Sequence, residues 1–572
     1  MKRLMGYLKQ NIWLVILGPF FKMVEAILEL FNPIFVAKII DNVITAPDKY
    51  YIIKFSALIV AFNVIGFICA IIGQKCASLT TARVGTNMRR DAFAQITSYS
   101  HAELDKFGTA SILNRLTNDI NQIEGAISMC MRTLMRTPFL LVGAFVLSLM
   151  INVKMSLIFL VLIPVVVIIL WLYMKKTRPY FHVIRKKLDN ISRVTRENLS
   201  GTRVIRSFNK QEFETKRFEE TSNDFTDTSI KVAKISALLN PVIYLIVDVA
   251  VVALLLLGGW QINIGGMSQG DIIALIDYVA IITVSLLTIS HIIVAFVRTS
   301  ASLHRLDEIM DTKSSISDAS NVKKYNKLDY DAILEFNNVS FNYTGDIKDK
   351  SFIKDLSFKI YPGQTIGIIG GTGSGKTTIA NLMTRFYDAT QGEILYKGKN
   401  IKEFSLEQLR HEISIVQQRS TLYSGTLRDN MRLRNPNVSD QEIIEALKIG
   451  QAWSFVEEWS NGLDYKIMAG GKNVSGGQMQ RLTIARALID KPEVLILDDS
   501  SSALDFMTDS KLRKGIKSLN TTTILISQRA TSIQNADLII VLDHGDVVGM
   551  GKHASLMKEC DIYREIYESQ SK

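Results

Sequence analysis

The sequence is poor in cysteine, and two of its long polar segments are almost free of proline. The 572 residues include four cysteines: Cys69, Cys76, Cys130 and Cys560. Their positions match neither the spacing of a metal site nor a paired disulfide framework, so we expect free thiols in a reducing compartment. Residues 77–133 hold no proline and residues 177–237 hold only Pro179. Both segments therefore lack the residue that most often ends a helix.

Long apolar segments, in contrast, fill the first half of the chain. Hydrophobic residues make up 48% of the whole, and six runs of roughly 20 residues or more stand out in the first half. They lie at about 12–40, 55–75, 134–153, 155–176, 238–262 and 271–297. Each run could cross a hydrocarbon core of ~30 Å, so together they predict a membrane domain. The first run lacks a small-residue cleavage site, which favours a long retained helix over a secretion signal.

The basic residues form no clustered face of the kind that binds nucleic acid, although the net charge is +11. Lysine and arginine instead gather in the N-terminal residues, in 83–136, in 175–234 and from Arg298 onward. The short turns on the other side of the predicted spans carry only Lys49 and Lys154. Because cationic loops tend to remain cytoplasmic, this bias predicts six crossings of the cell membrane with both termini in the cytoplasm.

The second half contains a phosphate-binding pattern. Residues 311–331 are polar and aperiodic, as in a linker, and a predicted strand at 365–369 runs directly into a glycine-rich loop. The loop reads Gly370-Gly371-Thr372-Gly373-Ser374-Gly375-Lys376-Thr377-Thr378. Glycines let backbone amides approach phosphates, and the helix that follows points its positive end at them. We expect Lys376 to contact the β and γ phosphates of ATP and the Thr377 hydroxyl to ligate Mg²⁺.

A second predicted strand, at 494–498, ends in Asp498. A carboxylate at the end of a buried strand after a glycine loop is placed beside the Mg²⁺ of a bound nucleotide. Asp498 is therefore a candidate metal ligand, and Asp499 follows it directly.

The segment Val474-Ser475-Gly476-Gly477-Gln478, before a predicted helix at 479–488, resembles the signature of ATP-binding cassette (ABC) proteins. With six spans ahead of it, the chain resembles an exporter-fold half-transporter. The resemblance implies an α-helical transmembrane domain over 1–310, a linker over 311–331 and an α/β P-loop nucleotide-binding domain over 332–572. It also implies ATP and Mg²⁺ as cofactors, with Ser475 and the glycine amides gripping the γ-phosphate of ATP held by the opposite subunit.

Other family segments match in order. By resemblance, Tyr343 stacks on adenine, Gln418 senses and ligates Mg²⁺, and the loop Ser502-Ala503-Leu504-Asp505 crosses the dimer interface. The cytoplasmic segments 77–133 and 177–237 have helical periodicity and read as prolonged membrane helices. Each is interrupted once, at Phe107-Gly108-Thr109 and at Ser200-Gly201-Thr202, where the threonine could cap the next helix. Either these are plain hairpins, or their tips touch the nucleotide-binding domain and transmit its motion.

Two departures from the family pattern bear on catalysis. Where the family has a glutamate that polarises the attacking water, this chain has Asp499, one methylene shorter. Where the family has a switch histidine, this chain has Gln528, which donates a hydrogen bond but carries no charge. A carboxylate withdrawn by ~1.5 Å holds water poorly, so we expect slow hydrolysis at this chain's own site.

This combination resembles the degenerate-site subunit of heterodimeric bacterial multidrug exporters. It implies a second half-transporter as partner, whose site the Ser475–Gln478 signature would complete. The predicted activity is ATP-driven export of amphiphilic drugs, lipids or peptides by alternating access. Two alternatives stay open: an exporter-fold importer of a metal chelate, and a nucleotide-gated channel or regulatory subunit.

Charged residues inside the spans are candidates for a substrate cavity. Lys22, Glu25 and Glu29 share one helix face in the first span, and Asp248 and Asp277 lie in the fifth and sixth spans. A charge at the bilayer centre costs ~2.5 to 3.5 kcal/mol on insertion scales, so such residues pair with each other or face a cavity. Pairing between helices, contact with a polar or cationic substrate, and a position near the membrane interface are the alternatives that the sequence leaves open.

Overall fold

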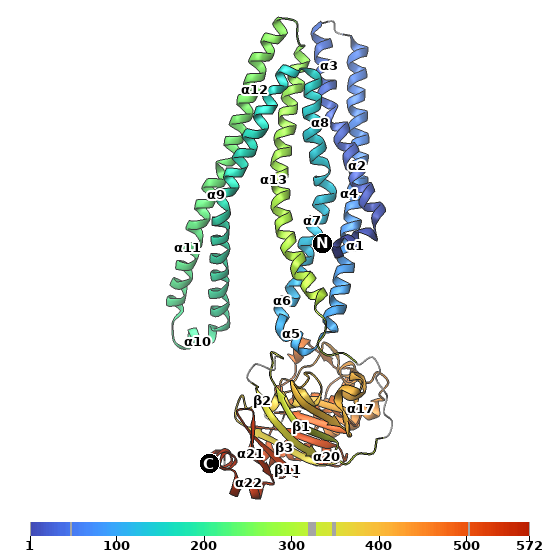
Figure 1. Ribbon diagram of the computed structural model, residues 1–572, viewed down its shortest axis with the longest axis vertical. Helices are drawn as coiled ribbons and strands as arrows, with labels where there is room; N and C mark the ends of the chain where they lie inside the picture. Colours follow the sequence, from blue (N-terminus) through green and yellow to red (C-terminus); the bar gives the residue numbers. More distant parts are fainter. Residues whose placement is uncertain (1, 46–47, 319–327, 346–350, 501–503, 571–572) are drawn as a thin grey trace. The chain divides into compact units, whose positions relative to one another are not determined.

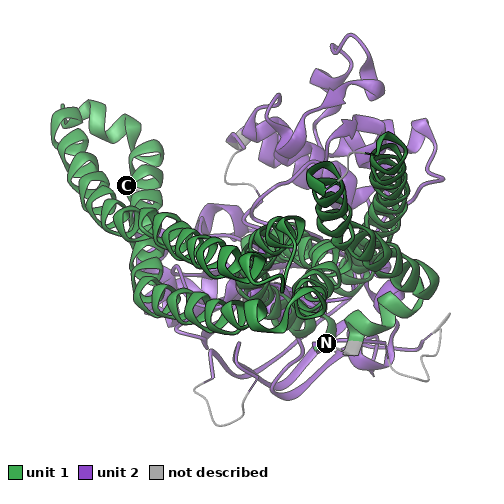
Figure 2. Cartoon of the chain, turned by 90° about the horizontal axis from the view of Figure 1, so that it is seen from above, with its two compact units in different colours: residues 1–97, 110–311 green, residues 98–109, 312–572 purple. Residues whose placement is uncertain are grey.

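The computed structural model describes residues 2–45, 48–318, 328–345, 351–500 and 504–570. These form two compact units (Figure 2). Unit 1 comprises residues 1–97 and 110–311, and unit 2 comprises residues 98–109 and 312–572. The short segment 98–109, which lies within the expected transmembrane domain, thus makes its contacts with the nucleotide-binding part of the chain.

Unit 1 consists of long helices (Figure 1). They are α1 Lys2–Lys9, α2 Ile12–Leu30, α3 Asn32–Thr45, α4 Lys49–Thr97, α6 Thr109–Asn114, α7 Ile120–Met129, α8 Arg136–Ile151, α9 Val153–Ser200, α10 Thr202–Ser207, α11 Gln211–Ala237, α12 Leu239–Asn263 and α13 Gln269–Asp311. Two π-helical turns, Arg115–Asp119 and Cys130–Leu134, join α6 to α7 and α7 toward α8.

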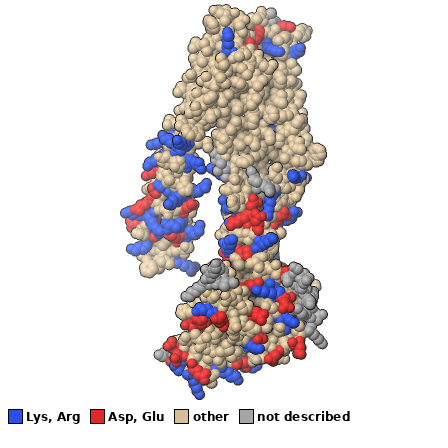
Figure 3. All heavy atoms as spheres, viewed as in Figure 1, with Lys and Arg blue, Asp and Glu red and all other residues tan. Residues whose placement is uncertain are grey.

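Among the described residues of unit 1, five helical segments are long and apolar enough to span a membrane. They are Lys49–Thr97, Thr109–Ile151, Val153–Ser200, Gln211–Asn263 and Gln269–Asp311. They contain the second to sixth predicted runs, and each continues well beyond the apolar stretch, as the periodicity of the polar segments predicts. Lysine and arginine gather on the part formed by α9 to α11 (Figure 3). The upper part of the view, where the helices carry their apolar stretches, shows few charged side chains on its surface.

The first run, expected as one long helix, is divided. Helix α2 ends at Leu30, and α3 begins at Asn32, directly before Pro33. Pro33 provides no amide that could donate to the last turn of α2, so the hydrogen bonds of that helix do not continue here. The hydroxyl of the buried Tyr278 donates to the carbonyl oxygen of Leu30 (2.8 Å) at the break.

The two polar helical segments end in short transverse helices rather than in single breaks. In the first, helix α5 (His101–Phe107) is bounded by residues 98–100 and by Gly108, whose φ of 71° favours glycine. In the second, α10 is bounded by Gly201 and by Asn209, whose φ is 52°.

The expected capping by threonine is wrong at the second tip. Gly201 is the N-cap of α10, and its φ of −91° needs no glycine. Thr202 is the first helical residue, and its hydroxyl donates back to the carbonyl oxygens of Asn198 (2.9 Å) and Leu199 (3.0 Å). The threonine hydroxyl therefore completes the preceding helix instead of starting the next one.

Unit 2 contains a six-stranded sheet in the order β12-β11-β3-β10-β9-β6, a four-stranded antiparallel sheet in the order β2-β1-β4-β5, and the pair β7-β8. The strands are β1 Leu334–Phe341, β2 Ile353–Ile360, β3 Thr365–Gly370, β4 Gln391–Tyr396, β5 Lys399–Asn400, β6 Ile413–Val416, β7 Gly425–Thr426, β8 Lys466–Ile467, β9 Val494–Asp498, β10 Thr522–Ile526, β11 Leu538–Asp543 and β12 Asp546–Gly551. The helices other than α5 are α14 Lys376–Met383, α15 Leu406–Glu412, α16 Leu427–Met431, α17 Asp440–Ile449, α18 Trp453–Val456, α19 Gly476–Leu488, α20 Phe506–Lys517, α21 Ala530–Ile533, α22 His553–Glu559 and α23 Asp561–Gln570.

Five neighbouring strands of the larger sheet, β11, β3, β10, β9 and β6, run parallel, and the last four of them lead to the segments singled out in the sequence. Ile526 at the end of β10 is paired with Asp498 on one side and with Ile368 on the other. The five residues of β9 are all buried, which explains their uninterrupted apolar run. The strand register therefore brings the four carboxyl ends to one edge, where ligands bind in sheets of this kind.

Candidate functional site

The carboxyl ends of four of the parallel strands each lead into a segment singled out in the sequence. β3 leads into the glycine loop, β6 into Gln418, β9 ends at Asp498, and β10 leads into Gln528. Segments that are far apart in the chain are in this way collected at one sheet edge.

The glycine loop has the backbone that a phosphate cradle needs. Gly373 and Gly375 have φ values of 81° and 102°, which favour glycine. A Cβ at Gly370 would lie 2.2 Å from the carbonyl oxygen of Leu542, so the loop begins against β11 with no room for a side chain. Nothing lies within 4 Å of a Cβ built at Gly371 or Gly373, so backbone amides there are open to a ligand.

Lys376, the first residue of α14, is folded over this loop. Its Nζ donates to the carbonyl oxygens of Gly370 (2.9 Å) and Gly371 (2.7 Å). Burial lowers the pKa of Lys376, while the charges of Asp498 and Asp499 act in the opposite direction. The lysine thus lies among the groups that phosphate oxygens would contact, next to two carboxylates.

Asp498 is buried and hydrogen-bonded to the side chain of Thr377. Burial raises its pKa, and the nearby Asp499 adds to the effect, while the Thr377 bond and Lys376 oppose it. A hydroxyl and a carboxylate held together at the edge of a phosphate loop provide the oxygen ligands that Mg²⁺ prefers. The structure brings these two predicted metal ligands together.

Asp499 is held close to the third predicted metal ligand. The Gln418 side-chain Nε2 donates to Oδ2 of Asp499 at 3.3 Å, and the Asp499 amide donates to the carbonyl of Ile526 at 2.8 Å. Asp499 has a φ of 47°, a left-handed conformation that aspartate tolerates better than most residues. Its carboxylate is therefore drawn toward the glutamine that follows β6.

Gln528 is contacted by a residue that the sequence did not single out. Gln570, at the end of α23, donates from Nε2 to the carbonyl oxygen of Gln528 (2.7 Å). Its Oε1 accepts from the amide of Ala530 (2.8 Å), the first residue of α21. One amide side chain thus contacts the main chain at the switch position and at Ala530, two residues further on. No local pattern marks Gln570, because its partners lie about forty residues away.

Tyr343 lies next to the phosphate loop. Its hydroxyl is 2.7 Å from the Thr378 hydroxyl, and about half of its surface is exposed. The ring is edge-on to Phe341 (4.9 Å between centroids) and to Tyr387 (5.5 Å). The aromatic side chain is therefore placed where a base attached to bound phosphates could stack, with its face open on one side.

Helix α5 is docked on the same aromatic group. The hydroxyl of Tyr387 donates to the carboxylate of Asp105 in α5. The ring of His101 stacks on Phe386 at 4.2 Å and 20°, and the Arg410 guanidinium lies 5.2 Å from the same ring. Burial and the charge of Arg410 lower the pKa of His101, while the charge of Asp105 raises it.

A capping box forms the start of α5. The Glu103 carboxylate accepts from the amide of Ser100 (3.0 Å) and also from the amide of Ser315 (3.2 Å) in the segment after α13. Burial raises the pKa of Glu103. Hydrogen bonds from Ser100 and Ser315 have the opposite effect, and the pKa is lowered overall. The pattern of serine followed three residues later by glutamate is the sequence signal that could have identified this helix.

The signature segment begins helix α19. Ser475 is its N-cap, with the Gln478 amide donating to the Ser475 hydroxyl (3.2 Å) and the Ser475 amide donating to Oε1 of Gln478 (2.9 Å). A Cβ built at Gly476 meets nothing within 4 Å. In the described part of the chain, no hydrogen bond joins these residues to the glycine loop. The predicted contact of this segment with ATP held by another subunit stays a prediction.

The loop after β9 is described only in part. Ser502 and Ala503 lie outside the described residues, whereas Asp505 is the N-cap of α20 and accepts from the Thr508 amide (2.9 Å) and hydroxyl (2.7 Å). Its predicted place at a dimer interface stays a prediction.

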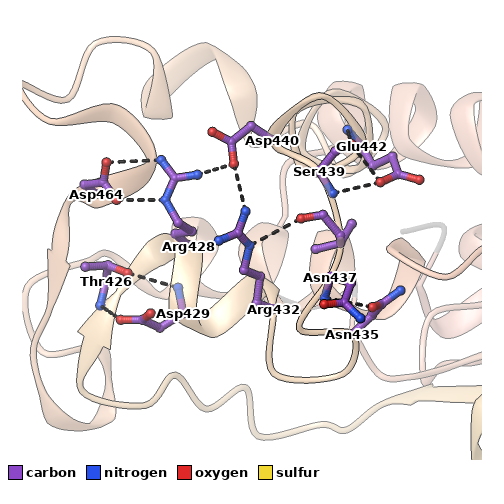
Figure 4. A network of polar contacts seen from close by, with 11 residues as sticks. Thr426, Arg428, Asp429, Arg432, Asn435, Asn437, Ser439, Asp440, Glu442 and Asp464 are labelled. Atoms are coloured by element: carbon purple, nitrogen blue, oxygen red, sulfur yellow. Dashed lines mark hydrogen bonds and ion pairs between the residues drawn. The ribbon is translucent and has the colours of Figure 1, made fainter.

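A polar network fixes the segment between Gln418 and the signature (Figure 4). Arg428 in α16 donates to both carboxylate oxygens of Asp464 (2.9 and 3.1 Å) and to Asp440 at the start of α17. Arg432 donates to the same Asp440 oxygen at 3.2 Å. Each pair alone contributes little at the surface, but a shared network holds β7 and β8 together and thereby positions the chain leading to α19.

In the membrane part, three of the five charged candidates are paired. Lys22 Nζ is 2.7 Å from Glu25 Oε2, and Arg136, at the start of α8, contacts Glu25 (3.6 Å) and Glu29. Gly73 in α4 makes room for the lysine, since a Cβ there would lie 3.1 Å from its Cγ. The two cations and two anions balance, so this cluster links α2 to α8. Sequence reasoning missed Arg136, which lies at the edge of an apolar run.

Asp248 and Asp277 are not brought into this cluster. Both are exposed, and neither has an ion-pair or hydrogen-bond partner within the residues that the structure describes. Exposed Ile273 and Val284 lie on the same face of α13 as Asp277.

The residues at the sheet edge fit ATP and Mg²⁺. Open loop amides and Lys376 suit the phosphates, and Thr377, Asp498 and the Gln418 amide oxygen suit the metal ion. This fit rests on the donor set and on a glycine loop whose backbone leaves space where side chains would stand.

Comparisons with known proteins agree with this geometry. The family model of the ABC transporter transmembrane region matches residues 15–286, and the ABC transporter model matches residues 353–502. The ABC transporter ATP-binding protein YfiB of Bacillus subtilis is 32% identical over 570 residues, covering 100% of this chain and 98% of that protein. The ATP-dependent lipid A-core flippase of Escherichia coli is 28% identical over 535 residues, covering 93% and 91%. A bacterial Atm1-family ABC exporter with ATP bound shares the fold, with a TM-score of 0.78, 21% identity and 99% coverage of both chains.

Proposed function

Because this chain belongs to the ABC transporter family, with an exporter-type transmembrane region and a nucleotide-binding domain, we propose that it is one half of an ATP-driven exporter. Its cargo is an amphiphilic drug, lipid or peptide, moved outward across the cell membrane by alternating access. A lipid is supported by the name of the Escherichia coli relative, an ATP-dependent lipid A-core flippase. Both termini lie in the cytoplasm.

The phosphate loop of this chain binds ATP and hydrolyses it slowly. The observation that carries this proposal is the placement of Asp499, whose short side chain is hydrogen-bonded to Gln418 at 3.3 Å. A general base must reach the attacking water within hydrogen-bond distance, and a misplacement of about 1 Å can cost ~10²-fold in rate. Bound Mg²⁺ would offset charge on the β and γ phosphates. Asp498 and Thr377 would hold it.

Gln528 adds to the slow turnover. A glutamine can donate to the γ-phosphate but cannot stabilise negative charge with a charge of its own. The bridge from Gln570 to both Gln528 and Ala530 keeps this position in one conformation. A rigid, uncharged switch position is suited to holding ATP rather than to rapid turnover.

The other site belongs to a partner half-transporter. The Ser475 N-cap and the open Gly476 would complete a phosphate loop on that subunit, where a glutamate and a histidine carry out hydrolysis. The asymmetry between an intact signature and an altered base is the reason to expect a heterodimer.

Nucleotide binding reaches the membrane helices through α5. Thr378 and Tyr343 share a hydrogen bond, Tyr343 contacts the ring of Tyr387, and Tyr387 holds Asp105 of α5. Only residues 98–100 separate α5 from α4, so closure of the nucleotide domains would pull on α4. ATP shifts the equilibrium by stabilising the closed state more than the open one.

The charged residues in the spans divide into two groups. The balanced cluster of Lys22, Glu25, Glu29 and Arg136 supports a structural role in joining helices. Asp248 and Asp277, exposed on apolar helices, support contact with a polar or cationic part of the cargo.

The test is purification of the tagged full-length chain from its own membrane. The proposal expects a second half-transporter to co-purify, and expects the chain expressed alone to show little ATPase activity. A chain that forms a dimer alone and hydrolyses ATP briskly would contradict the heterodimer.

A further inference from the structure

A polar cavity lies where the turn between α1 and α2 meets α4. Its volume is about 460 Å³. It is lined by Gln10, Asn11, Ala82, Arg83, Thr86 and Asn87. None of the lining residues is acidic, and one is a cation. The cavity is remote in sequence from every residue assigned to nucleotide or cargo above.

The hydrogen bonds inside the lining occupy the side-chain oxygens of Asn11 and Gln10 and leave the NH₂ groups of these two residues available. Arg83 Nη1 donates to Oδ1 of Asn11 (3.2 Å), and Asn87 Nδ2 donates to Oε1 of Gln10 (3.1 Å). The amide NH₂ groups of Gln10 and Asn11 have no hydrogen-bond partner in the described residues. Arg83 and Thr86 also line the cavity, and each carries hydrogen-bond donors.

Arg83 also has no acidic partner. Within the described chain, no carboxylate lies within ion-pair distance of its guanidinium. The neighbouring arginines on α4 are paired: Arg89 with Glu124 (2.9 Å) and Arg90 with Asp91 (3.0 Å). The cavity therefore combines an uncompensated positive charge with amide donors, which is the donor set that an anion needs.

The residues beside the cavity are of the kinds found at a membrane surface. Ile12 and Trp13, which follow Asn11, are exposed, Trp13 by 76%, and the exposed Ile16, Leu17 and Phe20 continue the apolar surface along α2. Tryptophan at the end of such a surface is typical of the headgroup region. α2 and α4 run antiparallel, because Gly18 packs near Cys76 while Asn11 contacts Arg83. Arg83 is thus placed just outside the hydrocarbon core.

We propose that this cavity binds the phosphate group of an acidic membrane phospholipid. A guanidinium can hold two phosphate oxygens in a fork, the Gln10 and Asn11 amides reach the remaining oxygens, and the acyl chains lie along the exposed apolar side of α2. The lipid would fix the turn between α1 and α2 at the bilayer surface. This site is separate from the proposed ATP and cargo sites, and it depends only on the membrane placement of α2.

Native mass spectrometry of the detergent-solubilised full-length chain tests the proposal. It compares titration with dioleoyl phosphatidylglycerol and with dioleoyl phosphatidylcholine. The variants are Arg83→Ala, which removes the cation, and Thr86→Glu, which puts an acid at an exposed position of the lining. The matched control is Arg90→Ala, on the same helix but outside the cavity. Thr86→Glu carries the test if Arg83→Ala does not fold.

We expect both variants to bind the tightest phosphatidylglycerol about tenfold more weakly than wild type and the control, with no difference for phosphatidylcholine. Equal phosphatidylglycerol binding by wild type and both variants would overturn the proposal. A third arm adds inorganic phosphate to wild type. If inorganic phosphate binds in an Arg83-dependent way while phosphatidylglycerol binds no better than phosphatidylcholine, the cavity takes a soluble anion, and the assignment to a lipid is wrong.

Discussion

Replacing Asp499 with glutamate is expected to raise the rate of ATP hydrolysis at the phosphate loop of this chain. The Asp499 carboxylate is 3.3 Å from the Gln418 amide and leads from the end of β9, next to Asp498. One added methylene advances the carboxylate by ~1.5 Å, beyond Gln418 and toward the water that attacks the γ-phosphate.

The size of the gain follows from the cost of misplacing a base. A general base contributes ~10²- to 10⁴-fold, and an error of about 1 Å costs ~10²-fold. Aspartate retains part of the rate contribution of a well-placed base. We therefore expect Asp499→Glu to increase kcat ~10- to 100-fold, which corresponds to a decrease in the activation free energy of about 1.4 to 2.7 kcal/mol. KM for ATP should hardly change, because the carboxylate does not bind the ground state. The left-handed φ of 47° at this position costs the glutamate variant about 1 kcal/mol of stability.

Single-turnover hydrolysis of radiolabelled ATP measures this rate. The background is Gly476→Asp, which places a carboxylate where the partner's γ-phosphate would lie and meets nothing within 4 Å in this chain. Hydrolysis that remains then comes from the Lys376 loop, and Asp499→Asn gives the rate without a base. An Asp499→Glu variant that folds, binds ATP normally and hydrolyses no faster than wild type would refute the reasoning.

Three further predictions concern the contacts around the site. Tyr387→Phe keeps the ring but removes the donor to Asp105, so amide exchange in 101–107 should rise about tenfold by hydrogen-exchange mass spectrometry. Gln570→Ala removes two hydrogen bonds at the switch position, so affinity for a fluorescent ATP analogue should fall a few-fold, to about a fifth or a third of wild type. Burial and the Arg410 charge lower the pKa of His101 below its ordinary 6.5, so undocked α5 binds more protons than docked α5, and protection of 101–107 should fall as pH drops below 6.5.

Each of these has a matched control. Tyr396→Phe removes a different tyrosine hydroxyl, bonded to Glu412 (2.7 Å), and should leave exchange in 101–107 unchanged. Gln570→Glu can still accept from Ala530 but cannot donate to Gln528. Its affinity for the ATP analogue should therefore lie between those of wild type and Gln570→Ala. His101→Phe should abolish the pH effect. A pH dependence that survives in His101→Phe would assign it to another group.

The parts of the site that sequence could predict are those whose chemistry is local. The glycine loop, the strand ending at Asp498 and the Ser475 cap are each contained in a few consecutive residues, and the sheet edge collects them because parallel strands share one direction. Their assignment needed no knowledge of distant contacts.

Other features could not be predicted because they depend on pairing across the chain. Gln570 bridges the switch position from about forty residues away, and Arg136 compensates Glu29 from another helix. The division of the first apolar run, in contrast, has a local signal in the sequence, Asn32-Pro33. This signal was overlooked because the run stays apolar on both sides of it.

The most direct measurement compares the steady-state ATPase activity of two variants of this chain in the complex purified from its own membrane. Asp499→Asn disables the base of this chain's loop, and Gly476→Asp disables the signature that serves the partner's loop. An asymmetric transporter predicts that Asp499→Asn retains most of the activity while Gly476→Asp loses nearly all of it. If Asp499→Asn abolishes hydrolysis and Gly476→Asp leaves it intact, the fast site is on this chain and the account is contradicted.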